Sequence, residues 1–326
     1  MSDLFSKLLL LRSPGIGPVK YNELVKKFGS VELAAESLMA NSTLRDSVLR
    51  EIDSAQKLDI HYICDDSEFY PAGLKNIKNH PPVITARGNI ETLKKRIVSM
   101  VGTRHATAFG MSFMSDLAQA FVENGFAVAS GMAIGTDSSA HRGALRGVEN
   151  SQTIAVLAGG ADYIWPLENE KLYYEIIERG VVISEMPVGY VPKGTNFIQR
   201  NHWIAGLAEK LILGEADAKS GSMATARFAI EYGVPLYAVP SHPSDSRSVG
   251  PNSLIASGNA KLCMGVSDFF DGEHPANASK KICDISESEN AILDALGLIP
   301  VSESVLANIV KKSISEIKCS LVVLEL

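Results

Sequence analysis

The sequence predicts an α/β protein whose core is a parallel sheet, with one helical block before it and another after it. Within residues 59–272, short apolar runs alternate with segments of helix length, which is typical of βαβ units. Residues 1–58 and 284–326 have helical patterns, the second ending in a β-like run at 321–326, and a polar linker at 273–283 precedes it. Of the 326 residues, 46% are apolar and 21% charged, which excludes a disordered chain.

Composition also indicates the cellular compartment of the protein and which kinds of site it lacks. No apolar run approaches the roughly 18 to 20 residues that a bilayer span needs, and we identify no secretory signal. We therefore expect a cytoplasmic protein without a membrane partner. The four cysteines form no C-x-x-C pair, which argues against a zinc site or a disulfide framework. We expect neither a metal nor a cofactor.

The helical block 1–58 contains a Ser-Pro-Gly-Ile-Gly-Pro turn, residues 13–18, between its first two helices. This arrangement resembles a helix-hairpin-helix, whose turn amides approach a DNA phosphate without reading bases. Residues 1–60 carry eight basic and eight acidic side chains, so charge does not favour a strong DNA clamp. A protein-interaction module explains the block equally well.

The central block supplies the strands and helices of the predicted sheet. The apolar runs are 97–101, 127–130, 153–157, 181–183, 211–213 and 236–240, and the clearest helical segments are 110–124, 137–147 and 168–179. Because crossovers between parallel strands are right-handed, the loops that follow the strands gather at the carboxyl edge of the sheet. Gly, Ser, Thr, Arg and Asn are concentrated in these loops, so we expect the functional site at that edge.

The loop after the first run contains Gly102, Thr103 and Arg104. It matches neither G-x-G-x-x-G nor G-x-x-x-x-G-K-[ST], which argues against an NAD site and a P-loop ATPase. A strand followed by a glycine and a helix N-terminus still offers free amides to a phosphate, and Arg104 adds a planar donor fork. The alternative is that Arg104 pairs with an internal carboxylate.

The loop after the second run contains Gly131 and Gly135, which allow an anion-binding nest of backbone amides. Asp137 and His141 follow at i and i+4 on the next helix, a spacing that suits a metal or an acid–base pair. We favour the simpler interpretation, in which Asp137 caps the helix and His141 packs or bonds locally, because no third ligand is evident.

The segment 197–208 places Arg200, Asn201 and Trp203 before a helix, and Lys193 lies upstream. Cations beside an aromatic ring are a common grip on single-stranded nucleic acid. The alternative is that Trp203 belongs to the core and that Asn201 holds a loop, a role that Asn252 also suits.

A further segment gathers hydroxyl and backbone amide groups at a helix entrance, where they suit a phosphate. Its residues are Ser220, Gly221, Ser222 and Thr225. A nucleophilic serine is the alternative, but the segment lacks the G-x-S-x-G elbow and no base is identifiable.

Charge is distributed unevenly around the net value of −6. Residues 71–110 carry seven Lys or Arg against one acid, a local charge of +6, whereas residues 284–326 carry three Lys against seven acids, or −4. A local basic field attracts polyanions. Charge alone favours the simpler interpretation of an unevenly charged, solvated surface.

Seven segments resemble the DprA/Smf family of DNA-processing proteins, in the order of that family. They are VGTRHATAFG, SGMAIGTDSSAHRGAL, TIAVLAGGADYIWPLEN, ISEMPVG, FIQRNHWIAGL, SGSMATA and PNSLIASG. The helical start is similar to the sterile-alpha-motif-like domain that precedes the core in many members. The tail 284–326 is similar to their C-terminal winged-helix domain.

The resemblance implies an extended Rossmann-like fold that binds single-stranded DNA, in a homodimer without catalytic activity. It implies a role in natural transformation, in which the protein shields incoming strands from nucleases and helps to load the RecA recombinase. It also implies a phosphate-binding loop at 102–104, an Arg-Asn pair at 200–201 and a Ser-Gly-Ser loop at 220–222. Four further candidate DNA contacts follow from their chemistry: Gly131, Lys193, Thr225 and Asn252.

The sequence departs from the family at three places. The usual Gly-Ser-Arg reads Gly102-Thr103-Arg104, which keeps the hydroxyl. The usual Arg-Asn-Arg reads Arg200-Asn201-His202, which removes one positive charge near neutral pH. The tail is short and acidic, so we expect it to bind a partner or to be vestigial rather than to contact DNA. The alternative function is a nucleotide-binding enzyme similar to Rossmann-like phosphoribohydrolases. Their Pro-Gly-Gly-x-Gly-Thr loop is absent, and the nearest stretch, 157–161, lacks both the Gly-Thr and the acid.

Overall fold

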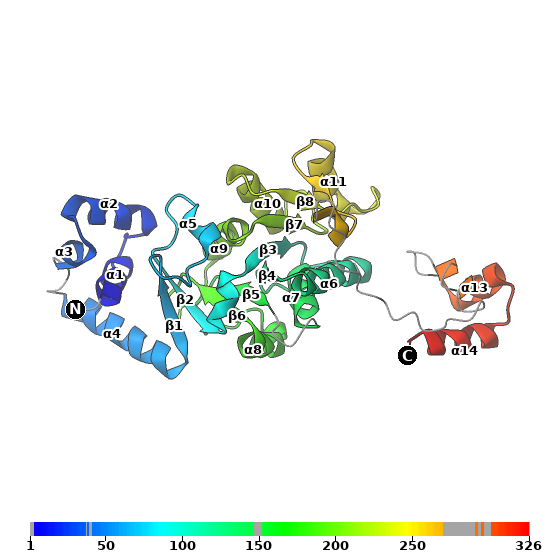
Figure 1. The fold of residues 1–326 in the computed structure, drawn as a ribbon, viewed down its shortest axis with the longest axis horizontal. Coiled ribbons are helices and arrows are strands. Elements are labelled where there is room, and N and C mark those ends of the chain that lie inside the picture. The colour runs from blue at the N-terminus through cyan, green and yellow to red at the C-terminus, as the bar shows by residue number, and fades with distance from the viewer. Residues whose placement is uncertain are drawn as a thin grey trace. The chain divides into compact units, whose positions relative to one another are not determined.

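The structure is a computed structural model, shown in Figure 1, and it describes residues 3–36, 38, 41–146, 152–269, 291–292, 295–296 and 301–325. The chain divides into two compact units, residues 1–271 and 272–326. The predicted linker at 273–283 lies outside the described residues. The predicted α/β fold, with a mostly parallel sheet and an N-terminal helical domain, is confirmed.

Four helices form the N-terminal domain: α1 (Asp3–Leu11), α2 (Pro18–Phe28), α3 (Val31–Glu36) and α4 (Ser42–Lys57). Pro18 occupies the first turn of α2, where its missing N–H costs nothing, and Gly29 ends that helix at φ 87°. The Asn41 side chain caps α4 by accepting a hydrogen bond from the Leu44 amide at 3.0 Å.

The helical domain shares its core with the edge of the sheet. Leu8 and Leu10 of α1 are fully buried in a cluster that also contains Val83 and Tyr62 from strands β2 (Val83–Gly88) and β1 (Ile60–Cys64). Arg12 forms two hydrogen bonds of 2.8 Å with the Glu51 carboxylate. The Tyr62 hydroxyl donates to the same carboxylate at 3.1 Å, which ties helices to strand.

The sheet has nine strands in the order β1-β2-β6-β5-β4-β3-β7-β8-β9. The strands after the first two are β3 (Arg96–Val101), β4 (Phe126–Ser130), β5 (Thr153–Val156), β6 (Val181–Ser184), β7 (Lys210–Leu213), β8 (Leu236–Ala238) and β9 (Lys261–Leu262). Strand β2 is antiparallel to both β1 and β6, and every other pairing is parallel. Each of the six predicted runs contains a strand, whereas β1, β2 and β9 lie outside those runs.

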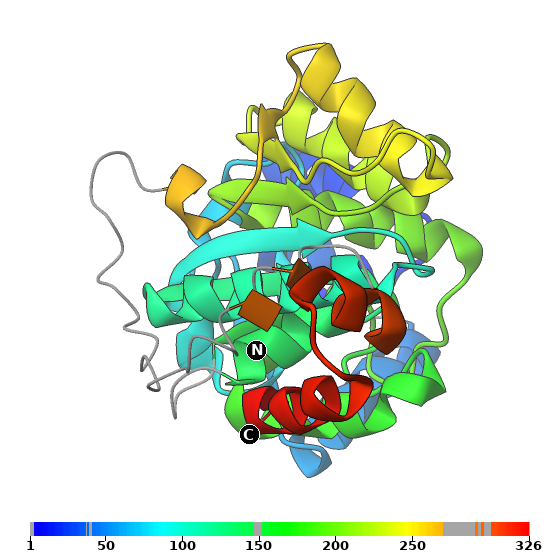
Figure 2. The ribbon, with the colours of Figure 1, turned by 90° about the vertical axis from the view of Figure 1, so that its right-hand side faces the viewer.

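Helices cover both faces of the sheet, and Figure 2 shows β3 in cyan between green and yellow-green helices. Val98 and Met100 face the side of α6 (Ala108–Glu123) and α7 (Thr136–Arg146), and α8 (Glu170–Arg179) packs on the same side. Ile97 and Val101 alternate to the other side. That side carries α5 (Ala72–Lys75), α9 (Gly194–Leu207), α10 (Gly221–Glu231) and α11 (Val249–Ala256).

Short 3₁₀ turns complete the connections: η1 (Ile90–Lys94), η2 (Leu167–Asn169), η3 (Ser246–Ser248) and η4 (Val266–Phe269). Among the residues that the structure describes, no helix combines the length and apolar character needed to cross a membrane.

The second unit contains α13 (Glu303–Val310) and α14 (Ile314–Glu325) around a small core that includes Leu306 and Ile317. The β-like prediction for 321–326 is wrong as far as residue 325, because α14 continues through it. The reason lies at the start of the helix. The Glu316 carboxylate accepts from the Ser313 amide at 2.9 Å, while the Ser313 hydroxyl accepts from the Glu316 amide at 3.3 Å. This reciprocal cap starts a helix that local β-propensity does not stop.

Candidate nucleic-acid interface

The strand order places a crevice at the carboxyl ends of β3 and β7. Strand β3 is the first of the parallel strands, and the chain continues to β4 on one side of it and later to β7 on the other. Ligands bind at such reversal points in open α/β sheets. A pocket of about 330 Å³ lies there. Nine of the twelve predicted contact residues line it: Gly102, Thr103, Arg104, Arg200, Asn201, Ser220, Gly221, Ser222 and Thr225.

Glycines let the first two loops interlock. A side chain at Gly102 would collide with the Thr136 side chain. Gly135 has φ +79°, and a Cβ there would lie 2.6 Å from the Thr103 carbonyl oxygen, so both its conformation and its surroundings require glycine. The Thr136 amide donates to that same carbonyl at 3.2 Å. The loops after β3 and β4 therefore hold each other in place.

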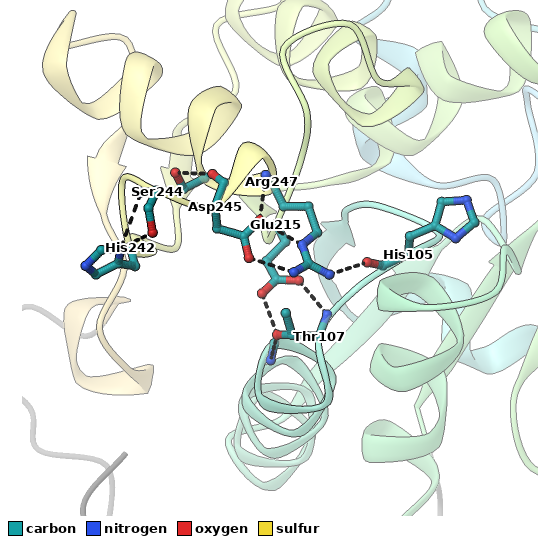
Figure 3. A network of polar contacts seen from close by, with 9 residues as sticks. His105, Thr107, Glu215, His242, Ser244, Asp245 and Arg247 are labelled. Atoms are coloured by element: carbon teal, nitrogen blue, oxygen red, sulfur yellow. Dashed lines mark hydrogen bonds and ion pairs between the residues drawn. The ribbon is translucent and has the colours of Figure 1, made fainter. Parts of the chain in front are cut away.

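A polar network fixes the loop after β3 from its other side, as Figure 3 shows. The Thr103 amide donates to the Glu215 backbone oxygen at 2.6 Å. The Thr107 amide and hydroxyl donate to the buried Glu215 carboxylate at 2.7 and 2.6 Å. Arg247, which pairs with Asp245 at 2.6 Å, donates to the His105 carbonyl at 3.0 Å. Sequence reasoning missed this support because Glu215 and Arg247 are far away in the chain.

The Arg104 side chain is exposed at the pocket. Within the described ranges its guanidinium has no hydrogen-bond or ion-pair partner, so the alternative of an internal carboxylate partner is not observed. A fixed loop thus presents an uncommitted donor fork, which suits the oxygens of a phosphate.

Arg200 has a different environment. It lies inside α9 rather than before a helix, so that prediction is wrong by about two turns. Asn196 accounts for the earlier start, because its side chain accepts from the Lys193 amide at 2.8 Å and begins α9 there. The Arg200 guanidinium is buried and donates to the carbonyls of Gly131 and Val156, the latter at 2.7 Å.

Burial lowers the pKa of Arg200 to about 10, and the neighbouring Asp137 carboxylate opposes that shift. Asp137 lies in the first turn of α7, and its carboxylate accepts from the Ala133 amide at 3.4 Å. Burial raises the pKa of Asp137, while Arg200 opposes the rise. Both residues line the pocket, and the charge of each acts on the pKa of the other.

His141 does not act with Asp137 as a pair of ligands. Its Nδ1 lies 2.7 Å from the Thr153 hydroxyl in the core, and burial lowers its pKa to about 3, so the ring is neutral at pH 7. Over the described part of the chain, no group of three or more His, Cys, Asp or Glu side chains is arranged to hold a metal ion.

The third wall of the pocket is the start of α10. Ser220 precedes the helix, and its hydroxyl lies 2.8 Å from the Ser222 hydroxyl. The side-chain amide of Asn201 donates to the Gly221 carbonyl at 3.2 Å and so links α9 to α10. Thr225 is buried one turn further along the helix. The first amides of α10 and its hydroxyls are available to an anion.

The three remaining predicted contacts lie outside this pocket. Gly131 lines a neighbouring slot with Arg200. Lys193 is exposed at the start of α9. Asn252 holds a loop, because its side chain donates to the Ser241 carbonyl at 2.8 Å and accepts from the Ser241 amide at 3.3 Å.

The structure shows the environments of two ring side chains near the site, Trp203 and His202. Trp203 is 8% exposed and belongs to the core, as the alternative interpretation predicted. His202 stacks on Phe228 with ring centroids 3.4 Å apart, and its Nδ1 lies 2.5 Å from the Tyr232 hydroxyl. Burial lowers the pKa of His202, so this position adds no positive charge at pH 7.

Sequence reasoning missed several pocket residues: His105, Ala133, Phe197, Ile198 and Asp217. The aromatic ring of Phe197 was within reach of a pattern argument, because it precedes Arg200 by one helical turn. Two arginines and two aspartates line the pocket. Since Arg200 and Asp137 compensate each other, the exposed charges are Arg104 and Asp217. The arginines and aspartates that line the pocket thus give it hydrogen-bond donors but no net positive charge.

The fold and the pocket define an open α/β protein with a polar crevice at the reversal point of its sheet. The family model for DNA recombination-mediator protein A matches residues 61–273, and the model for the DprA-like N-terminal HHH domain matches residues 2–55. The chain belongs to the DNA recombination-mediator protein A family.

Relatives of known name agree with that assignment. The chain is 34% identical to DNA processing protein DprA of Bacillus subtilis over 68% of its length and 74% of the relative's. It is 32% identical to protein Smf of Synechocystis over 77% of its length, a match that spans only 57% of that longer protein.

Solved structures agree as well. DNA processing protein A of Streptococcus pneumoniae matches with a TM-score of 0.65 and 29% identity, covering 82% of this chain and 96% of that one. The Helicobacter pylori protein, whose structure is described for its unique single-stranded DNA binding mode, matches with a TM-score of 0.59 and 30% identity. That match covers 64% of this chain and 94% of the Helicobacter chain.

Proposed function

We propose that this protein binds single-stranded DNA through its sugar–phosphate backbone in the crevice at β3 and β7, and that it acts in DNA processing during natural transformation. The observation that carries the proposal is Arg104, which is exposed and has no side-chain partner among the described residues. It lies on a loop fixed from two sides, and the start of α10 lines the same pocket. Contacts of this kind take phosphates of any sequence. Single-stranded DNA binding by the Helicobacter relative supports the assignment.

The finer parts of the proposal rest on the family. We propose a cytoplasmic homodimer without catalytic activity that protects incoming strands and helps to load the RecA recombinase. The recombination-mediator name of the matching family supports the RecA step. Mixing the protein with RecA on DNA coated by a single-strand-binding protein tests that step. Faster RecA filament formation is expected, and unchanged kinetics would contradict it.

No observation favours the nucleotide-hydrolysing alternative. The serines at 220 and 222 bond each other at the start of α10, and the one histidine on α7 is buried at Thr153. Incubation with nucleoside monophosphates tests this alternative directly, because release of free base would establish it.

The central experiment is a salt series of fluorescence anisotropy with labelled oligo-dT, single-stranded and then as a duplex. We expect preference for the single strand and weaker binding as salt rises. Arg104→Ala is expected to weaken binding to many sequences alike and to make the slope of log K against log salt shallower by about 0.7, the value for one phosphate contact on a single strand. A loss confined to one sequence would contradict backbone recognition.

Two matched variants sharpen this test. Asp217→Asn removes the opposing exposed charge from the same pocket, so it is expected to strengthen binding. Arg50→Ala removes an exposed arginine from α4 in the helical domain and is expected to leave affinity unchanged. Equal losses from Arg50→Ala and Arg104→Ala would show that overall charge, not the crevice, governs binding.

A further inference from the structure

A narrow aromatic slot adjoins the phosphate pocket. Tyr163, Trp165 and Pro192 line it, and Phe197 and Arg200 are shared with the pocket. The slot encloses only about 10 Å³, far less than a nucleobase occupies. A ligand that reaches this place must therefore contact the outer surface of the aromatic side chains rather than enter between them.

Trp165 is the most unusual member of the slot, because 46% of its surface is exposed. The second tryptophan, Trp203, is 8% exposed. Leu167, two residues after Trp165, is 68% exposed. Val191, which precedes Pro192, is 59% exposed. These exposed apolar side chains belong to the slot or lie next to it in the chain, and exposed apolar patches mark contact surfaces.

Helix α9 connects the slot to the pocket. Phe197 and Asn201 lie one turn apart on the same face of the helix, and Lys193 precedes its first residue. The rise of about 1.5 Å per residue places the backbone of 193 and 201 about 12 Å apart. Lys193 directly follows Pro192 of the slot, while Asn201 lies in the pocket with Arg104. Cations therefore stand at both ends of this path.

The charges around the slot favour a polyanion with flat rings over a protein partner. Among the described residues, none of those that line the slot is acidic. The carboxylate of Asp162, the nearest acid in the chain, accepts from the Gly189 amide at 2.8 Å. Glu168 is exposed beside Leu167, and Glu170 is exposed two residues further along the chain. Aromatic rings beside a cationic groove are a common platform for the bases of single strands.

We propose that Trp165 is a base-stacking subsite that extends the DNA path beyond the phosphate pocket. A base of the strand whose phosphate contacts Arg104 stacks on the exposed face of the Trp165 indole, and Lys193 contacts the backbone between them. This inference rests on the proposed single-stranded DNA binding. It adds a contact to the bases that is tolerant of sequence, since every base has a π face.

Tryptophan fluorescence tests the proposal, because one of the two tryptophans is exposed and the other is buried. Addition of unlabelled oligo-dT to the full chain is expected to quench the emission, and Trp165→Phe is expected to abolish the quenching. An abasic oligonucleotide of the same length carries the phosphates without bases. It is expected to bind more weakly and to cause no quenching.

Affinity measurements complete the test. Trp165→Ala is expected to weaken oligo-dT binding about fivefold or more and to leave binding of the abasic strand unchanged. Trp165→Phe keeps an aromatic ring and is expected to retain most of the affinity. Tyr174→Ala removes a ring of α8 that is 49% exposed but lines neither cavity, so it serves as the matched control.

The outcomes separate the inference from the proposed function. If oligo-dT binds without quenching, or if Trp165→Ala binds it as tightly as the unmodified chain, Trp165 is not a base subsite. A Trp165→Ala protein that binds DNA normally but fails in RecA loading would assign this surface to a protein partner instead. If neither oligonucleotide binds at all, the proposed function fails as well.

Discussion

At the scale of single residues, the two arginines of the crevice have opposite roles. The sequence presents both as phosphate ligands, because each sits in a segment with glycine, hydroxyl or amide neighbours. Folding leaves Arg104 exposed and encloses Arg200 among the carbonyls of Gly131 and Val156. Burial depends on which segments pack around a side chain, and no local pattern contains that information. The residue types could be predicted, whereas their division of labour could not.

This division predicts different effects on stability. Arg200→Met leaves two buried carbonyls without a donor and Asp137 without its counter-charge, so it is expected to lower the free energy of unfolding by about 3 kcal/mol. Arg104→Ala is expected to change it by about 0.5 kcal/mol or less, as for other surface substitutions. Urea unfolding of both variants provides the measurement. Equal stabilities of the two variants would show that the buried hydrogen bonds of Arg200 do not stabilise the fold.

At the scale of elements, the regular βαβ units were predictable and the irregular connections were not. The period of the apolar runs marks β3 to β8, because buried parallel strands are continuously hydrophobic. Strands β1 and β2 escape this signal, since polar residues such as His61 and Thr85 interrupt them. The start of α9 depends on a side-chain cap from Asn196, and α14 depends on the cap formed by Ser313 and Glu316.

Because the loops after β3 and β4 contact each other closely at Gly135, we expect a substitution of this glycine to cost more stability than a substitution of a glycine with open space around it. Gly125 and Gly135 have nearly the same φ, +82° and +79°, but Gly125 has no heavy atom near the position of a Cβ. Gly125→Ala thus measures backbone strain alone, about 1 kcal/mol. Gly135→Ala adds a collision with the Thr103 and Arg104 backbone, so it is expected to cost clearly more and to weaken DNA binding. Thermal unfolding and anisotropy would show both effects, and equal costs for the two would contradict the interlock.

At the scale of the whole molecule, the important boundary is the seam between the helical domain and the sheet. A cavity of about 290 Å³ lies in this seam, lined by Arg12, Ile16, Pro82, Glu185 and other residues. Burial raises the pKa of Glu185 to about 7, while Trp203 and Gln199 oppose the shift. At a pH between about 4.5 and 7, the folded protein thus retains a proton on Glu185 that the unfolded chain has lost.

The sign of the resulting pH dependence follows from this raised pKa. Between about pH 4.5 and pH 7 the folded state binds more protons at Glu185 than the unfolded state, so the contribution of this residue to the free energy of unfolding falls as pH rises. Its slope is at most about 1.4 kcal/mol per pH unit. Glu185→Gln is expected to remove this contribution. The free energy of unfolding of the variant should therefore rise relative to that of the unmodified chain as pH approaches 7. If the free energies of unfolding of the two proteins change in parallel with pH across this range, the raised pKa of Glu185 is contradicted.

The shared core of α1, Tyr62 and Val83 also determines how this protein unfolds locally. Since the leucines of α1 pack against the first two strands and Arg12 binds Glu51 beneath Tyr62, neither part can expose its apolar side chains without the other. Amide hydrogens in α1 and β2 should therefore exchange through the same opening event. By the same logic, we expect a chimaera that exchanges α1 to α4 together with β1 and β2 to fold better than one joined at the end of α4.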